Sequence, residues 1–270
     1  MSLVFNSEAL PLKSKILIFG ASGKMGVKIK ELLDSACFEA EFCFGATSKT
    51  AKSELDLAIK GCDVIIDFSH PDALFNYAHL AIKHSKLIVS GTTGFSKEQE
   101  GLILSLVKND GLKIIMSYNT SFGVNVFFKI AKELSKALNI ELCPEYDAEI
   151  IETHHVLKKD APSGTAITLG KCVAEGRGLD FDKVKCFERS GITGQKPSGQ
   201  IGFASVRSGG IVGEHTLIFG SGKDTIELTH RAFSRDIFAE GAIKLALQGL
   251  KKLKAGQLNE SKIYEYKDIL

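Results

Sequence analysis

The sequence has no hydrophobic run long enough to cross a membrane. Apolar stretches such as residues 16–19 and 64–66 are far shorter than the ~20 residues that span a bilayer. The N-terminal stretch MSLVFNSEALPLKSK also lacks the charged-then-apolar pattern of a secretory signal peptide. We therefore expect a cytoplasmic protein with no membrane partner.

An excess of charge of either sign is missing too. Lys and Arg number 34 and Asp and Glu number 32, which gives a formal net charge of +2. This balance provides no strong field to attract nucleic acid or an anionic membrane surface. We therefore expect no nucleic-acid partner.

The cysteines never reach the CxxC spacing that is typical of zinc and redox sites. A structural disulfide is rare in a cytosolic chain of this size, and no cysteine lies in the polar cluster that a catalytic thiol needs. We interpret most of the six as small core residues: Cys37, Cys43, Cys62, Cys143, Cys172 and Cys186.

What is present indicates a compact globular protein. Hydrophobic residues make up 44% of the 270 residues and charged residues 24%, which is too apolar for a disordered chain. The length favours two domains, because a domain usually holds ~100–200 residues.

Short apolar runs alternate with helical patterns through the first half of the chain. The run Lys15–Phe19 predicts a strand, and apolar residues on one side of residues 24–33 predict a helix. The same order repeats up to about residue 120, with strands expected at 42–44, 63–67, 87–89 and 113–115. This pattern predicts a Rossmann-like, doubly wound parallel sheet.

The pattern changes near Gly123. A long helix is expected at residues 124–138, followed by strand-like segments at 148–153, 202–207, 214–219 and 225–229. These segments favour a second, α+β domain with a mixed or antiparallel sheet. The last helix, residues 236–250, could pack on either domain.

The expected first strand is followed by GASGKMG, with Gly20, Gly23 and Gly26 at the start of the next helix. Glycines let the backbone turn sharply and approach a pyrophosphate, whose charge is met by free N–H groups and the positive end of the helix dipole. A tight turn without a ligand would give the same spacing. The position after the first strand of a doubly wound fold favours a dinucleotide cofactor.

Three further loops are candidates for the same cofactor site. The second strand ends in GATSK, where Thr47, Ser48 and Lys49 suit a ribose 2′-phosphate better than a bare ribose, so NADPH is favoured over NADH. The loops SGTTGF (90–95) and SYNTSFGVN (117–125) offer hydroxyls and amides to a nicotinamide. Each could equally be a polar turn or a helix cap.

The stretch ETHHVLKKDAPSGTA concentrates polar groups in residues 152–166. On a strand, His154 and His155 face opposite ways, so one of the two is expected to deliver a proton while the other shapes or binds. Lys158 lies just past the strand and could return to the His154 side. No HxH or HExxH spacing accompanies the histidines, so we expect no metal.

The end of this stretch predicts a helix start. In Asp160-Ala161-Pro162-Ser163-Gly164-Thr165, aspartate, proline and serine are common capping choices. The same helix N-terminus, flanked by Lys158, is also a place to bind a carboxylate. The two interpretations are compatible.

Five stretches, in order along the chain, resemble the 4-hydroxy-tetrahydrodipicolinate reductase family, the dihydrodipicolinate reductases of bacterial lysine and diaminopimelate biosynthesis. They are GASGKMG, SGTTGF, SYNTSFGVN, HHVLKKDAPSGTA and VRSGGIVGEHTLIF. The fourth is highly specific, whereas the glycine loop is shared with many dehydrogenases. The resemblance spans nearly the whole chain.

The resemblance implies that NADH or NADPH reduces a small cyclic dicarboxylate, 4-hydroxy-tetrahydrodipicolinate, with loss of water. It implies a homotetramer, with a dinucleotide-binding domain of residues 1–122 and 234–270 and a substrate-binding and tetramerisation domain of residues 123–233. Some members read NADH with an acidic residue after the second strand, which this sequence lacks.

The resemblance also implies roles for individual residues. His154 would be the acid/base and Lys158 a second proton donor. The substrate would be held by His155, Ser163, Gly164 and Thr165. The cofactor would be held by Gly20, Ala21, Ser22, Gly23, Lys24, Met25, Gly91, Thr92, Thr93, Ser117, Tyr118, Asn119 and Thr120. Lys49 joins this set because of its place in the GATSK loop and not because of the resemblance.

Two other functions fit parts of the sequence. A two-domain dehydrogenase acting on a semialdehyde or homoserine would share the fold, but the phosphorylating semialdehyde type needs a reactive cysteine in a polar setting. A non-catalytic dinucleotide sensor would keep GASGKMG but would have no reason to keep His154, Lys158 and residues 163–165 together.

Overall fold

The computed structural model describes residues 13–35 and 37–269, which form two compact units. One holds the described residues up to Thr120 and those from Phe238 on, and the other is Ser121–Ile237. The division falls at 120 where the sequence suggested 122, and at 237 where it suggested 233. Residues 1–12 of the predicted first domain lie outside the described residues.

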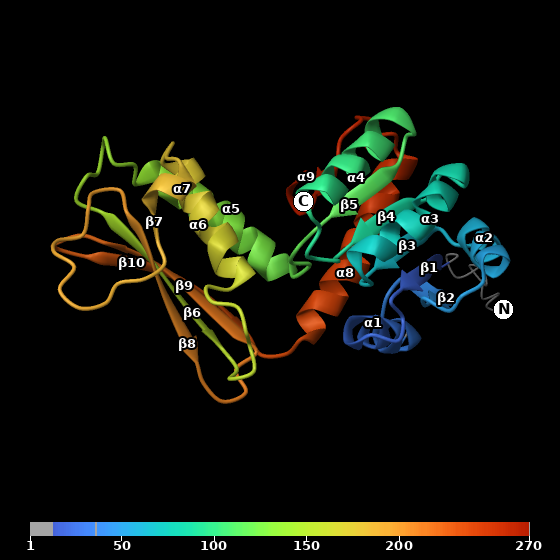
Figure 1. Cartoon of the computed structure of the whole chain (residues 1–270), viewed down its shortest axis with the longest axis horizontal. Helices are drawn as coiled ribbons and strands as arrows, with labels where there is room; N and C mark the ends of the chain where they lie inside the picture. Colours follow the sequence, from blue (N-terminus) through green and yellow to red (C-terminus); the bar gives the residue numbers. More distant parts are fainter. Residues whose placement is uncertain (1–12, 36, 270) are drawn as a thin grey trace, which may run out of the picture. The chain divides into compact units, whose positions relative to one another are not determined.

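The first unit is built on a six-stranded sheet in which all neighbouring strands run parallel (Figure 1). The strand order is β11-β5-β4-β3-β1-β2. The strands are β1 (Ser14–Phe19), β2 (Ala40–Ala46), β3 (Val64–Asp67), β4 (Leu87–Ser90), β5 (Lys113–Met116) and β11 (Tyr264–Glu265). The order reverses at β1, because the chain runs from β1 outward to β2 and then returns past β1 to β3.

Alternate residues of the strands supply two cores, one on each face of this sheet. Ile16 and Ile18 pack in one core, and Leu17 and Phe19 pack in the other, so β1 is buried on both sides. The first core is completed by α1 (Lys24–Asp34), α8 (Asp236–Lys254) and α9 (Tyr266–Ile269), and the second by α2 (Lys52–Gly61), α3 (Pro71–Lys83) and α4 (Lys97–Asn109). The predicted doubly wound sheet is confirmed.

The C-terminal segment joins this first unit. Apolar residues of α8 such as Ala242, Ile243 and Ala246 are fully buried in the core that contains α1. After α8, the short strand β11 pairs with β5 and extends the sheet. The helical pattern alone left the placement of the last helix open, and the family resemblance assigned residues 234–270 to this domain. The sequence gave no sign of β11, because a strand of two residues has no measurable periodicity.

The second unit contains a mixed five-stranded sheet with the order β10-β9-β6-β8-β7. Strand β6 runs parallel to β8 and antiparallel to β9, which confirms the predicted mixed sheet. Its elements are α5 (Phe122–Ala137), β6 (Asp147–His154), α6 (Gly164–Gly176), α7 (Phe181–Val184), β7 (Lys185–Cys186), β8 (Ile201–Arg207), β9 (Gly213–Gly220) and β10 (Thr225–Ala232).

Helices α5 and α6 pack against one face of this sheet (Figure 1). Ile150 and Leu217 from the strands lie in one core with Leu169 and Val173 of α6. The opposite face of the sheet is exposed: Ile151, which lies on it, is 36% exposed. Its register partner Ala204 in β8 and the nearby Val206 are exposed as well.

The cysteine interpretation was wrong for most of the six side chains. Cys62 is buried, but Cys37 and Cys43 are exposed and the other three are partly exposed, all as free thiols.

Within the described part of the chain, no helix combines the length and the hydropathy that crossing a bilayer demands.

Candidate active site

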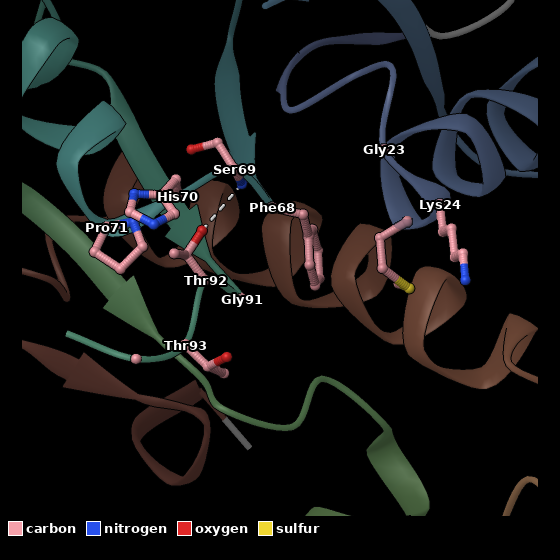
Figure 2. Close-up of a pocket in the computed structure, with 11 residues that line it drawn as sticks. Gly23, Lys24, Phe68, Ser69, His70, Pro71, Gly91, Thr92 and Thr93 are labelled. Atoms are coloured by element: carbon pink, nitrogen blue, oxygen red, sulfur yellow. Dashed lines mark hydrogen bonds between the residues drawn. The ribbon is translucent and has the colours of Figure 1, made fainter. Parts of the chain in front are cut away.

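The first unit has a cleft of about 460 Å³ at the carboxyl ends of its strands. It is lined by the loops that follow β1, β3 and β4, next to the point where the strand order reverses (Figure 2). This is where doubly wound folds bind nucleotides. The lining residues are Gly23, Lys24, Met25, Phe68, Ser69, His70, Pro71, Gly91, Thr92, Thr93 and Gly94.

The geometry of the glycine loop fits a bound pyrophosphate. Gly20 has a φ of +76°, and a Cβ there would lie 2.3 Å from the carbonyl oxygen of Phe68. A Cβ on Gly26 would lie 2.3 Å from the carbonyl oxygen of Gly20. Helix α1 then begins at Lys24 with no side-chain cap from Gly23. Its first N–H groups therefore face the cleft as donors for an anion.

A buried carboxylate holds two of the cleft loops in place. Asp67, at the end of β3, is fully buried and accepts hydrogen bonds from the hydroxyls of Ser90 and Thr92, each at 2.8 Å. The backbone N–H of Ser69 donates to Asp67 at 3.1 Å. It also donates to the Thr92 hydroxyl at 3.1 Å (Figure 2). The loops after β3 and β4 are thus tied to one another at the floor of the cleft.

Six of the predicted cofactor residues line this cleft: Gly23, Lys24, Met25, Gly91, Thr92 and Thr93. Gly20, Ala21 and Ser22 form the turn that leads into α1. Lys49 is exposed in a turn closed by the Thr47 and Thr50 hydroxyls. Residues 68–71 were missed, because the loop FSHP carries no glycine signal.

The loop of residues 117–120 does not line the cleft, although it belongs to the same unit. Its side chains bond within the unit: the Thr120 hydroxyl donates to the Phe238 carbonyl at 2.7 Å, and the Ser117 hydroxyl donates to the Asn119 carbonyl at 2.7 Å. Tyr118 is 60% exposed and donates to Glu100 at 3.1 Å. A cofactor role for these residues stays a prediction.

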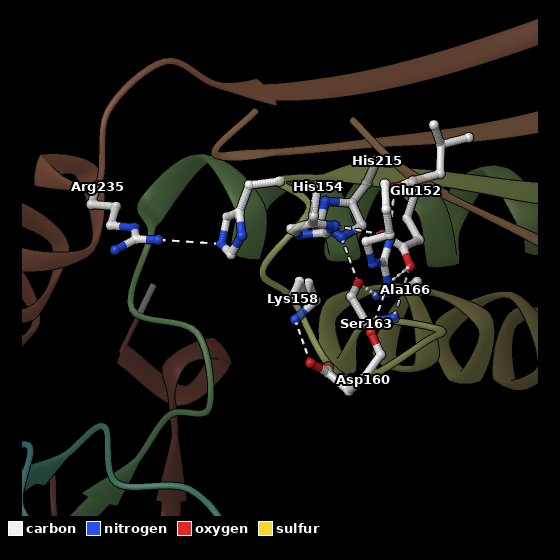
Figure 3. Close-up of polar contacts among 11 residues, drawn as sticks. Glu152, His154, Lys158, Asp160, Ser163, Ala166, His215 and Arg235 are labelled. Carbon is white, nitrogen blue, oxygen red and sulfur yellow. Dashed lines mark hydrogen bonds and ion pairs between the residues drawn. The ribbon is translucent and has the colours of Figure 1, made fainter. Parts of the chain in front are cut away.

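The second cluster of polar groups lies in the other unit, at the carboxyl end of β6 (Figure 3). The burial of β6 alternates, so Ala148, Ile150, Glu152 and His154 face inward. Ile151 and Thr153 lie on the opposite face from His154, as the alternation of a strand requires. His155 follows the end of the strand and is partly exposed.

Glu152 connects most of this cluster. One carboxylate oxygen contacts Nδ1 of His154 and accepts from Arg207 at 2.9 Å. The other accepts from Arg207 at 2.7 Å and from the backbone N–H of Ser163 at 3.2 Å. Burial alone raises the pKa of Glu152, but the hydrogen bonds from His154 and Arg207 outweigh it and lower the pKa to about 2. Glu152 is therefore an anion at neutral pH.

Ser163 caps α6 and contacts a second buried histidine. Its hydroxyl accepts from the Ala166 N–H at 3.1 Å and lies 2.8 Å from Nε2 of His215. Burial, and then the nearby positive charge of His154, lower the pKa of His215 to about 3. The His215 ring is therefore neutral, and it meets the His154 ring edge-on with the centroids 5.0 Å apart.

The remaining predicted residues surround the start of α6. The Lys158 ammonium lies 2.9 Å from Asp160 (Figure 3). His155 Nε2 lies 3.3 Å from a guanidinium nitrogen of Arg235. Gly164 begins α6, and a Cβ added there would meet nothing within 4 Å. The helix start therefore has open space beside it, as a bound carboxylate requires.

Sequence reasoning missed Glu152, Arg207 and His215. The two-residue spacing of Glu152 and His154 on a strand was a usable signal, because it places them on one face. His215 lies opposite Glu152 in β9, and Arg207 lies opposite His154 in β8. These pairings depend on strand register across more than fifty residues, which one sequence does not provide.

Two family models together match nearly the whole chain. The model of the N-terminal part of dihydrodipicolinate reductase matches residues 14–120, and the model of the C-terminal part matches residues 123–270. The chain belongs to the dihydrodipicolinate reductase family. It is therefore an oxidoreductase of lysine and diaminopimelate biosynthesis, and its Rossmann-like unit implies a nicotinamide cofactor.

Proteins with similar sequences carry the name of this enzyme family. A 4-hydroxy-tetrahydrodipicolinate reductase of Syntrophus aciditrophicus is 38% identical over 275 residues, which cover 95% of this chain and 98% of the relative. The enzyme of the same name from Geobacter metallireducens is 39% identical over 252 residues, which cover 86% of this chain and 92% of the relative.

Solved structures show the same fold. A dihydrodipicolinate reductase from Paenisporosarcina sp. TG-14, solved with dipicolinate bound, superposes with a TM-score of 0.68 at 24% identity. The match covers 95% of this chain and 98% of that one. A probable dehydrogenase from Thermotoga maritima, 11% identical, gives a TM-score of 0.56 over 94% of this chain and 92% of its own.

Proposed function

We propose that this chain catalyses the family's reaction and that its two units have separate roles in it. The reaction reduces (2S,4S)-4-hydroxy-2,3,4,5-tetrahydrodipicolinate to (S)-2,3,4,5-tetrahydrodipicolinate with loss of water. The first unit binds the nicotinamide cofactor, and the second binds the dicarboxylate and supplies a proton. The observation that supports this most directly is the cluster of His154, Lys158 and the start of α6, with its carboxylate partner Glu152.

The cleft between the loops of the first unit holds the cofactor in this proposal. Gly23, Lys24 and Met25 would receive the pyrophosphate at the start of α1. Gly91 and Thr93, on the loop after β4, would contact the nicotinamide half. The bound cofactor supplies the hydride, and the protein supplies orientation and charge.

His154 is the proton donor of the proposed reaction. Glu152 occupies its Nδ1, which leaves Nε2 for proton transfer to the substrate. Lys158 is the second donor, on the loop that joins β6 to α6. The partner of Lys158 is the exposed carboxylate of Asp160, so the ammonium can exchange this contact for a substrate group.

The substrate carboxylates bind at the start of α6. The first-turn N–H groups of Gly164 and Thr165 point toward the helix N-terminus, where an anion is favoured. Ser163 shapes this turn as its cap, and His155 adds a polar ring beside Arg235. The dipicolinate held by the relative from Paenisporosarcina is likewise a small ring with two carboxylates.

Cofactor preference and assembly extend the proposal. Lys49 is exposed after β2 and suits a 2′-phosphate, which favours NADPH over NADH.

The sheet face that carries Ile151 and Val206 is exposed and partly apolar, with Thr216 and Thr229 hydroxyls 2.9 Å apart on it. Such a face supports a homotetramer in which these sheets pack together.

A coupled assay tests the proposed function. The preceding synthase generates the substrate, and oxidation of NADPH is followed in the wild type and in His154→Gln. A general acid contributes typically ~10²–10⁴ in rate, so kcat should fall by that range with NADPH affinity unchanged. His79→Gln, at an exposed histidine on α3, is the matched control and should keep wild-type turnover.

The outcomes separate the candidate functions. Wild-type turnover in His154→Gln would remove His154 as the acid. Retained NADPH binding without any oxidation by the wild type would favour a dinucleotide sensor instead of a reductase.

A further inference from the structure

The environment of His154 contains a carboxylate that the proposed reaction does not itself use. Glu152 is 1% exposed, and its two oxygens receive four contacts, from His154, the Arg207 guanidinium twice and the Ser163 N–H. A buried carboxylate without such partners would be strongly unfavourable. This one joins the acid of β6 to the carboxylate-binding start of α6.

We propose that Glu152 is the positioning residue of His154, and that Arg207 holds Glu152 in that role. The inference rests on the proposed function, because it takes His154 as the proton donor. An ionised carboxylate can only accept hydrogen bonds, so the proton between it and His154 belongs to Nδ1 of the ring. This fixes the tautomer and directs Nε2 away from Glu152.

The position of the opposite ring nitrogen supports this orientation. Nε2 of His154 lies beside Gly213 at the start of β9, where an added Cβ would lie 3.0 Å from it. Glycine at this position leaves the space beside Nε2 that a Cβ would fill. The ring is thus held at Nδ1 by Glu152, while the position beside Nε2 carries no side chain, which leaves room there for the group that a general acid protonates.

Arg207 extends the same restraint to the loop that carries Lys158. Besides its two bonds to Glu152, Arg207 donates to the backbone carbonyl of Asp160 at 2.6 Å. Asp160 is the ion-pair partner of Lys158. One guanidinium therefore connects the partners of both proposed proton donors, and its planar fork suits this task in a way that a lysine would not.

The charged and titratable groups around Glu152 come from four elements. Arg207 faces it from β8, and His215 lies opposite it in β9. His154 follows it on β6, and Lys158 and Asp160 lie on the next loop. Because His215 is neutral, Glu152 is the charge that stabilises a protonated His154 ring directly.

The test compares steady-state kinetics of Glu152→Gln with the wild type in the coupled assay from pH 6 to 10. The amide keeps the size of the side chain and removes its charge. We expect kcat to fall by about 10²-fold, the lower end of what a general acid contributes, with KM changed less than about threefold. The alkaline limb of the pH–rate profile should also move to lower pH in Glu152→Gln, because the protonated ring has lost its ion-pair partner.

A double-mutant cycle tests the role of Arg207. If Arg207 acts through Glu152, Arg207→Gln alone should lower kcat, and the variant with both Glu152→Gln and Arg207→Gln should be about as slow as Glu152→Gln alone. Glu175→Gln on α6, which removes a surface ion pair with Lys132, is the matched control and should leave kinetics unchanged. If Glu152→Gln does not fold, Glu152→Asp keeps the charge farther from His154 and should give a smaller loss of kcat with the alkaline limb in place.

The results distinguish this inference from the proposed function. A kcat within threefold of wild type, or a low kcat with an unmoved alkaline limb, overturns the positioning role of Glu152. His154→Gln is measured in parallel. If it is impaired while Glu152→Gln is not, only the positioning role fails; if His154→Gln is unimpaired, the acid assignment itself fails.

Discussion

Replacing Gly26 by alanine tests whether the glycine loop is shaped by close backbone contact. A Cβ at Gly26 would lie 2.3 Å from the Gly20 carbonyl oxygen and 2.6 Å from the Ala21 Cα. Ordinary contact begins near 3.4 Å, so the turn must open by about 1 Å. Both neighbours are backbone atoms, which cannot rotate out of the way. We therefore expect strain at the start of α1.

The magnitude follows from two opposing effects. Overpacking of this kind costs typically ~1–3 kcal/mol. Alanine in place of glycine inside a helix contributes up to ~1 kcal/mol of stability. Gly101 in α4 separates the two effects, because it is exposed and a Cβ there would meet nothing within 4 Å. Gly101→Ala should be more stable than Gly26→Ala by about 1–3 kcal/mol.

Thermal unfolding and NADPH titration measure the consequences. Each kcal/mol corresponds to about 2–4 °C in Tm for a domain of ~150–250 residues. Gly26→Ala should lower Tm and weaken NADPH binding about tenfold or more, because the displaced Gly20 carbonyl belongs to the cofactor loop. If Gly26→Ala raises Tm as Gly101→Ala does and binds NADPH like the wild type, the close-contact explanation is wrong.

Three further outcomes are expected. Lys49→Ala should raise KM for NADPH about tenfold and leave KM for NADH unchanged, as measured by steady-state kinetics, because one charged hydrogen bond to the 2′-phosphate is lost. His215 has a folded-state pKa of about 3, below its unfolded value near 6.5, so its contribution to stability is present above pH 6.5 and is lost as pH falls. Between pH 7 and 5 the wild type should lose about 2 kcal/mol more than His215→Gln in urea unfolding; equal losses would contradict this. Gly213→Ala, which adds a methyl 3.0 Å from Nε2 of His154, should lower kcat at least about tenfold, whereas Gly210→Ala, with open space, should not.

The fold could be predicted well where the sequence pattern reflects burial. The strands β3 and β4 are fully buried, so they begin as the apolar runs VII and LIV, and each ends in one buried polar residue, Asp67 or Ser90. Strand β6 buries one face, so its pattern alternates. β11 could not be predicted, because its two residues are defined by their pairing with β5 and not by their own pattern.

The site could be predicted only in part, for a related reason. His154, Lys158 and Ser163 lie within ten residues of one another, so their motif indicated a shared site. Arg207 and His215 reach the same site through strand register, which is set by the packing of the whole sheet. In the cleft of the first unit, the FSHP loop was missed because a loop is placed by the strand before it and not by its own composition.

The charges around His154 explain why this arrangement suits a dicarboxylate. The cluster holds the cations Arg207, Lys158 and Arg235 and the anions Glu152 and Asp160, which leaves one positive charge in excess. Protonation of His154 raises the excess to two, equal to the charge of a substrate with two carboxylates. In the proposed reaction the dianion binds beside this positive charge, and transfer of the His154 proton returns the site to the lower charge. The neutral state of His215 matters for this balance, because a second charged ring beside His154 would add a further positive charge to the site.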